Sequence, residues 1–167
     1  MKKTRFLLLI GLLLLQLFQS KAEEVTIDGI IYSYDTEGDA SVVRCDDGKT
    51  EAIVQEIVNG HNVTSICKEA FYCCTKLTTV QLPESITNID KYAFEYCWAL
   101  KSIKIPDNVT NIRESAFEWC SSLEEVILPR NLKRIENLAF SQCEGLKTIT
   151  KCQVFYPFQI TWKNHFL

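Results

Sequence analysis

The chain has 167 residues, a length that suits one domain with a hydrophobic core of its own, and its formal net charge at pH 7 is −3. Beyond the first five residues Lys and Arg do not cluster, which argues against a nucleic-acid partner, because such a partner needs a basic face. Two histidines are a small supply of general bases for an enzyme.

The first 22 residues have the pattern of a secretory signal peptide. Three basic residues precede an apolar run from Phe6 to Phe18, and Ser20-Lys21-Ala22 supplies the small residues that a signal peptidase reads. Because a spanning helix needs about 20 apolar residues, we expect no membrane span. We expect an exported domain in the extracellular space or on the cell surface, with the periplasm as the alternative. Cleavage after Ala22 removes only basic charges, so the mature domain is more acidic.

Residues 23–62 are predicted to form a β cap. Val25–Ile27 and Ile30–Tyr32 flank Asp28-Gly29, a pair that suits a two-residue hairpin turn. Further strand candidates are Ser41–Arg44 and Ala52–Val58, the latter followed by the turn pair Asn59-Gly60. A stack of repeats exposes an apolar end unless something covers it, and we expect these strands to do so.

Residues 63–154 are four repeats of 23 residues. The units are Val63–Ser85, Ile86–Asn108, Val109–Asn131 and Leu132–Val154. Each carries a phenylalanine, a leucine and a cysteine at fixed positions: Phe71, Phe94, Phe117 and Phe140; Leu77, Leu100, Leu123 and Leu146; Cys74, Cys97, Cys120 and Cys143. Such a fixed period is the signature of a stacked repeat fold.

Each unit predicts one strand and one turn segment. The pattern L-x-x-[VI]-x-[LI]-P has the alternation of a half-buried strand, which Pro83, Pro106 or Pro129 ends. The spacing Ala-Phe-x-x-Cys predicts a helical turn with its apolar side chains on one side. The expected fold is an α/β-type repeat solenoid, dominated by strands. It is a short right-handed stack with a parallel sheet on one face, helical turns on the other and the β cap at its N-terminal end.

The repeat resembles the BspA-like, or Treponema-type, leucine-rich repeat proteins of bacterial surfaces. Ala70–Pro83, Ala93–Pro106 and Ala116–Pro129 match the motif A-F-x-x-C-x-x-L-x-x-[VI]-x-[LI]-P in full. The fourth unit keeps the motif from Ala139 to Ile149 and then departs from it, with Lys151 and Cys152 in place of an aliphatic residue and proline. The resemblance implies adhesion to host or neighbouring-cell proteins.

We interpret the cysteine column as a packing ladder. Equivalent residues of neighbouring coils point the same way, whereas a disulfide needs converging Cβ vectors, and a free cysteine behaves as a small buried hydrophobe. The chain lacks the Cys and His spacing of a zinc site, so we expect no metal. Cys45, Cys67, Cys73 and Cys152 lie outside the column, and a pair among them, such as Cys45 with Cys67, is the remaining candidate for oxidation.

The sequence contains none of the usual catalytic motifs, so we predict no enzymatic activity and no cofactor. The acid pairs Glu124-Glu125 and Asp46-Asp47 would suit a glycan hydrolase only if their carboxylates converged. Neighbours on a strand face opposite sides, so solvated surface is the favoured interpretation.

Two surfaces remain as candidate binding sites. The first is the outward face of the predicted sheet: Thr79, Gln81, Ser102, Lys104, Glu125, Ile127, Thr148 and Thr150. The second is an aromatic patch of Tyr96, Trp98 and Trp119 on the turn side.

The sequence thus favours a secreted or cell-surface binding module, monomeric, that recognises a protein or glycan ligand. A truncated or structural surface antigen without a dedicated ligand is the alternative, and a glycan hydrolase is a weaker one. The aromatic-rich tail, residues 155–167, is predicted to cover the last repeat.

Overall fold

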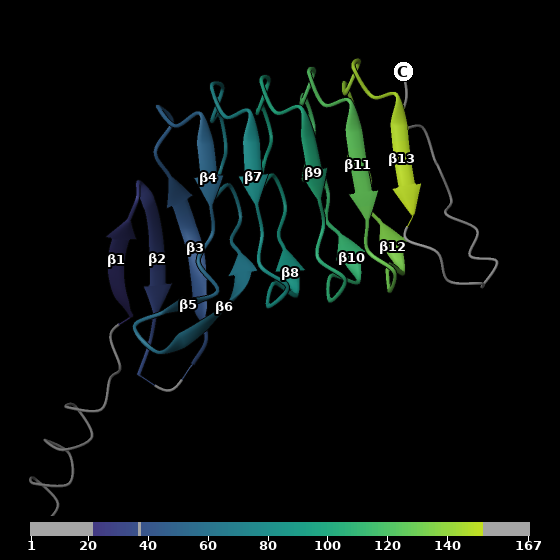
Figure 1. Ribbon diagram of the computed structural model, residues 1–167. Coiled ribbons are helices and arrows are strands. Elements are labelled where there is room, and N and C mark those ends of the chain that lie inside the picture. The colour runs from purple at the N-terminus through teal and green to yellow at the C-terminus, as the bar shows by residue number, and fades with distance from the viewer. Residues whose placement is uncertain (1–21, 37, 152–167) are drawn as a thin grey trace, which may run out of the picture.

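The computed structural model describes residues 22–36 and 38–151 (Figure 1). These residues form strands joined by turns, and no helix is found among them. The strands are β1 (Glu23–Ile27), β2 (Ile30–Tyr34), β3 (Ala40–Cys45), β4 (Glu51–Ile53), β5 (Ile57–Val58), β6 (His61–Ile66), β7 (Thr79–Gln81), β8 (Asn88–Ile89), β9 (Ser102–Lys104), β10 (Asn111–Ile112), β11 (Glu125–Leu128), β12 (Arg134–Ile135) and β13 (Thr148–Lys151). The predicted signal peptide, except Ala22, and the predicted tail lie outside the described residues.

One sheet has five parallel strands in the order β13-β11-β9-β7-β4 (Figure 1). Four of them, β7, β9, β11 and β13, fall on the segments whose alternation predicted them, which confirms the predicted parallel sheet. Their inward residues Val80, Ile103 and Val126 are buried, and their outward neighbours meet solvent. β4 pairs with β7 in the same parallel sense and adds a strand at the N-terminal edge.

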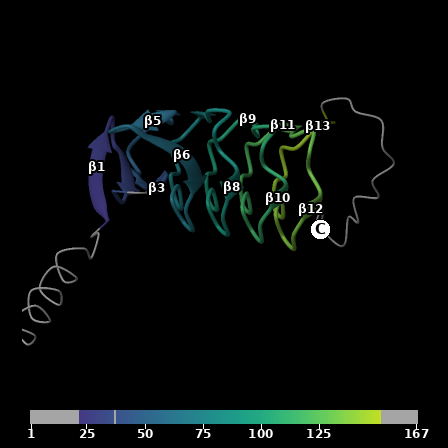
Figure 2. The ribbon, with the colours of Figure 1, turned by 90° about the horizontal axis from the view of Figure 1, so that it is seen from below.

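A second sheet runs along another side of the coils, in the order β1-β2-β3-β6-β8-β10-β12, with β5 paired to β6 (Figure 2). Each of β8, β10 and β12 has two residues, one of them the repeated isoleucine Ile89, Ile112 or Ile135. A coil therefore runs from a strand of the first sheet to a strand of the second, and then returns through the Ala-Phe segment.

The predicted helical turns on the far face are wrong. In each Ala-Phe-x-x-Cys segment the residue before the alanine and the residue before the cysteine have positive φ, for example Tyr92 at 60° and Tyr96 at 61°. A left-handed residue cannot continue a right-handed helix, so each segment stops after one turn. The freed amide groups reach the next coil instead. The N–H of Phe71 donates to the carbonyl of Ala93 at 2.8 Å, and the N–H of Phe94 donates to that of Ala116 at 2.8 Å.

The N-terminal strands form as the sequence indicates. β1 and β2 pair in antiparallel fashion across Asp28 and Gly29, which have φ values of 47° and 71°. These positive angles are those that a two-residue hairpin turn requires. β3 then pairs with β6 in parallel and so joins the hairpin to the repeats. Ile30 and Tyr32 of β2 are buried in the same core as the repeats, whereas the role of these strands as a cap stays a prediction.

The phenylalanine column forms a single file through the core. The ring centroids of Phe71 and Phe94 are 4.7 Å apart, and the two following pairs, up to Phe140, are each separated by 5.2 Å. The angle between the ring planes is 11° for the first pair and 4° for the others. Each ring is almost fully buried. The predicted stacking of equivalent positions is thereby confirmed.

The cysteine column lies beside this file. Cys74, Cys97, Cys120 and Cys143 are buried free thiols, as the packing-ladder interpretation predicts. The hydrogen bonds of these thiols give a further reason why cysteine occupies this position. The thiols of Cys97, Cys120 and Cys143 donate to the carbonyls of Phe71, Phe94 and Phe117 in the preceding coil, at 3.1, 3.2 and 3.0 Å.

Cys45 does not pair with Cys67, and both are free thiols. Cys45, at the end of β3, is hydrogen-bonded to Cys74, while Cys67 has Ser41 as its side-chain partner. Cys45 therefore begins the column. The hydrogen bond with Cys45, together with burial, raises the pKa of the Cys74 thiol, and burial raises that of Cys97 and Cys120.

We predict that Phe94→Ala lowers the free energy of unfolding by about 3–5 kcal/mol, because it opens a cavity between two stacked rings. Urea unfolding followed by circular dichroism would measure this loss. Ile57→Ala, at a side chain that is 58% exposed, is the control and should change the stability by less than about 0.5 kcal/mol. Equal losses of unfolding free energy in the two variants would contradict the idea that the phenylalanine stack stabilises the core.

We also predict that Cys97 and Cys120 resist alkylation in the native, reduced protein, because only the thiolate reacts and burial raises the pKa of both thiols. Iodoacetamide should modify the half-buried Cys73 before Cys97 and Cys120, which should react only after unfolding in urea. Peptide mass spectrometry would assign each site. Alkylation of Cys97 as fast as that of Cys73 would show that the ladder opens readily.

Candidate functional site

The predicted strand-face residues lie together on the outer side of the five-stranded sheet. Seven of them are exposed and Ile127 is half-buried. Register places Thr79 beside Ser102, Ser102 beside Glu125, and Glu125 beside Thr148, so these four side chains form one continuous row. Ile127 lies between Lys104 and Thr150 in a second row. Neighbouring strands are about 4.8 Å apart, which spaces the side chains evenly.

The sequence missed the first members of both rows. Glu51 pairs with Thr79 and Ile53 with Gln81, so β4 extends the strand face by one coil. Ile53 is 52% exposed, so it is a large apolar side chain at the edge of a row that also contains Ile127. The sequence pattern that could have assigned β4 to the repeats is weak, because the residues before Glu51 do not contain the Ala-Phe-x-x-Cys motif of the later coils.

The strand face carries fixed charges at its border. The ammonium group of Lys104 lies 2.6 Å from Glu84 Oε1, on the turn that follows β7. This hydrogen bond holds the pKa of Glu84 below its ordinary value, although partial burial acts the other way. One turn further, the Arg130 Nε group donates to Asp107 at 2.6 Å, and this bond lowers the pKa of Asp107. These exposed pairs orient side chains more than they stabilise the fold.

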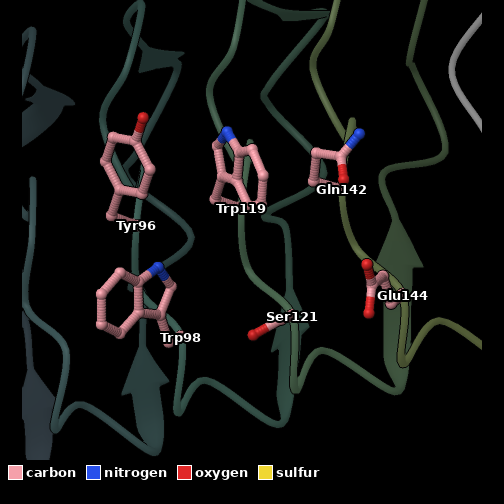
Figure 3. A pocket seen from close by; sticks show the side chains of 6 residues that line it. All are labelled: Tyr96, Trp98, Trp119, Ser121, Gln142 and Glu144. Carbon is pink, nitrogen blue, oxygen red and sulfur yellow. The ribbon is translucent and has the colours of Figure 1, made fainter. Parts of the chain in front are cut away.

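The predicted aromatic patch is one side of a shallow groove. Tyr96, Trp98 and Trp119 line it together with Ser121, Gln142 and Glu144, and its volume is about 370 Å³ (Figure 3). The rings of Tyr96 and Trp119 are nearly parallel, at 19°, with centroids 6.1 Å apart. Trp98 stands edge-on to Tyr96, at 87° and 6.3 Å. The three predicted residues are therefore in mutual contact through Tyr96.

Ser121, Gln142 and Glu144 were missed by the sequence analysis, although the repeat contains the signal. Tyr96, Trp119 and Gln142 occupy one repeat position in three coils, and Trp98, Ser121 and Glu144 occupy the position two residues later. Figure 3 shows these two rows side by side. Their polar members were passed over because a lone exposed serine, glutamine or glutamate is ordinary on a surface.

The backbone beneath the groove is fixed by bonds between coils. The N–H of Tyr96 donates to the carbonyl of Glu118 at 3.0 Å, and that of Trp119 donates to Ser141 at 2.9 Å. The Trp98 carbonyl accepts from Ser122 at 3.1 Å. These bonds hold both rows in register, so the groove is preformed.

The four side chains of the acid pairs are exposed, as the solvated-surface interpretation predicts. Glu124 lies 3.1 Å from the Lys147 ammonium group, while Glu125 belongs to the strand face. Asp46 accepts the N–H of Gly48 at 2.9 Å in a local turn. Within residues 22–36 and 38–151, no three His, Cys, Asp or Glu side chains are arranged to hold a metal ion. No helix long and apolar enough to cross a membrane is found in the same residues.

The geometry is that of a leucine-rich repeat solenoid, and the comparisons agree. The sequence profile of the BspA type leucine-rich repeat region matches residues 50–160 in six copies. Since this covers more than half of the chain, the protein belongs to the BspA type leucine-rich repeat family, as the resemblance indicated. The matched region begins at β4 rather than β7, in agreement with the pairing of these strands. No curated protein matches the chain.

Several solved structures are similar to this one, including the following three. A leucine-rich repeat protein from Bacteroides ovatus is 30% identical, with a TM-score of 0.67, over 76% of this chain and 37% of that one. A leucine-rich repeat protein from Bacteroides capillosus is 29% identical, with a TM-score of 0.68, over 78% of this chain and 99% of that one. A leucine-rich cell surface protein from Faecalibacterium prausnitzii is 27% identical, with a TM-score of 0.64, over 78% of this chain and 40% of that one. The chain thus spans less than half the length of the first and third.

We predict that Gly145→Ala destabilises the coil contact under the groove. A Cβ atom at Gly145 would lie 2.7 Å from the carbonyl oxygen of Ser121, the same atom that accepts the Gly145 N–H at 3.0 Å. The expected loss of stability is about 1–3 kcal/mol, measured by urea unfolding. Ser122→Ala, one coil earlier at the same repeat position, should be nearly neutral. A neutral Gly145→Ala would mean that the coils can separate locally without cost.

Proposed function

We propose that this protein is an exported binding module that recognises a protein partner through its strand face. One observation carries the proposal: outward side chains stand in unbroken rows across five parallel strands, above a fully buried core. Extended surfaces of this kind are what stacked repeats offer to partners. The rows mix hydroxyl, amide, carboxylate, ammonium and aliphatic groups, a composition that suits a protein surface more than a polyanion.

Membership of the family supports both protein binding and a location at a cell surface. Leucine-rich repeat domains are a repeat family associated with protein interactions, and one similar structure is described as a cell surface protein. Together with the signal-peptide pattern, this supports adhesion at a host or neighbouring-cell surface. In this proposal the module acts as a monomer, without a cofactor, a metal or catalysis, its N-terminal strands cap the stack, and a glycan is the second class of ligand.

A variant of the strand face tests the proposal. Thr79, Ser102, Lys104 and Glu125 would be replaced together by alanine, which removes four neighbouring contacts and leaves the net charge unchanged. Binding would be measured on an array of purified extracellular-matrix and cell-surface proteins, followed by titration of each protein that binds. We expect the Kd of a bound protein to rise by at least tenfold, since a few residues near the centre of an interface carry most of the binding free energy.

The control variant replaces Glu24, Thr26, Thr36 and Lys133, which are exposed and lie off the strand face, with the same change in charge. It should bind as the parent does. Unchanged affinity in a folded strand-face variant would reject this surface as the site. Binding to no protein of the array would favour a structural surface antigen. Turnover of a glycan or peptide substrate would overturn the proposal in favour of a hydrolase.

A further inference from the structure

The aromatic groove contains side chains that the fold does not require. Its upper row, Tyr96, Trp119 and Gln142, occupies the repeat position where every coil needs positive φ, and the first coil has Cys73 there. Small or polar residues such as glycine and asparagine adopt this conformation at least cost. Bulky aromatic residues at two of these positions are therefore unfavourable for folding, and Trp119 remains 40% exposed. Their presence indicates a role at the surface.

The rings offer flat faces to a ligand. Tyr96 and Trp119 lie nearly parallel in adjacent coils, and Trp98, in the second row, stands edge-on to Tyr96 with half of its surface exposed (Figure 3). The electron-rich face of an indole or phenol ring attracts a cation. The same wall already shows this contact, because the ammonium group of Lys68 lies 5.6 Å from the centroid of the Tyr92 ring.

The charge that lines the groove has the sign that a cation requires. Glu144 lines the groove, and none of the six lining residues is basic. Glu95 and Glu118 directly precede Tyr96 and Trp119 in the chain, and the two carboxylates are close enough to repel each other. Burial first, and then the neighbouring Glu118 and Glu69, raise the pKa of Glu95. The net charge of −3 adds a long-range attraction.

We propose that this groove binds one cationic side chain, arginine or lysine, of a protein partner. The guanidinium or ammonium group lies against Trp119 and Tyr96, with Trp98 at its side, and Glu144 accepts its hydrogen bonds. Ser121 and Gln142 supply further acceptors in the same two rows. The volume of about 370 Å³ suits a single side chain. The site uses no residue of the strand face, so it is a second point of contact for a partner.

Small probes test the site in the full chain without a known partner. N-acetyl-arginine amide and N-acetyl-lysine amide would be titrated while the indole N–H signals of Trp98 and Trp119 are followed by nuclear magnetic resonance. N-acetyl-citrulline amide is the matched probe, since it has nearly the shape of arginine without the charge. We expect a cationic probe to bind about tenfold more tightly than citrulline, and to weaken as salt is added.

Variants locate the binding within the groove. Trp119→Leu should weaken the cationic probe about tenfold, and Glu144→Gln should weaken it about threefold. Glu24→Gln, at an exposed carboxylate on β1, is the matched control and should leave binding unchanged. Circular dichroism would verify that each variant is folded, and Glu144→Gln, which keeps the shape of the side chain, still tests the site if Trp119→Leu does not fold.

Three results would overturn the proposal. Citrulline binding as tightly as arginine would make the groove an apolar site, and equal weakening by Glu24→Gln and Glu144→Gln would reduce the effect to the overall charge. Binding of methyl glucoside without binding of either cation would assign the groove to a sugar. Because the probes do not touch the strand face, none of these results bears on the strand-face proposal.

Discussion

The spacing between coils is the constraint on which the rest of the structure depends. Strands of a parallel sheet are held about 4.8 Å apart by their backbone hydrogen bonds. Parallel aromatic rings in offset contact prefer a similar separation, and the phenylalanine centroids are 4.7 to 5.2 Å apart. One distance therefore satisfies the backbone of both sheets and the core between them, so a residue type that suits a slot in one coil suits the same slot in the next.

The cysteine column follows from the same constraint. A side chain beside the phenylalanine file must be small, and it lies close to a carbonyl of the preceding coil. Alanine would fit but would leave that carbonyl without the contact, whereas the thiol of Cys120 donates to Phe94 at 3.2 Å while remaining an apolar group. Serine would make a stronger hydrogen bond at a higher cost of burial. Cysteine is the compromise, and its regular spacing reflects packing rather than pairing.

The sequence predicted those features that side-chain periodicity controls. Phe71 to Phe140, the column cysteines and the strand-face residues lie where the 23-residue period placed them, because burial and exposure repeat with the coil. The far wall was predicted wrongly because its form depends on the backbone. Positive φ at Tyr92, Ser115 and Leu138 breaks the helix, yet none of these residue types signals a left-handed conformation. β4 was assigned outside the repeats because its coil lacks their motif, whereas its pairing with Thr79 to Gln81 and the family match from residue 50 place it in the stack.

The broken helix also determines what the surface can present. In a helical wall, side chains of successive coils would be separated by the width of a helix, about 10 Å. Here backbone hydrogen bonds join the turns of adjacent coils, for example from the N–H of Trp119 to the carbonyl of Ser141. The ring centroids of Tyr96 and Trp119 are therefore only 6.1 Å apart. Close rows then form on two sides of the coil, polar on the strand face and aromatic on the turn wall. A partner that contacts both sides would bind through two weak sites held at fixed separation, and a rigid stack makes their contributions additive without an entropic loss for ordering the module.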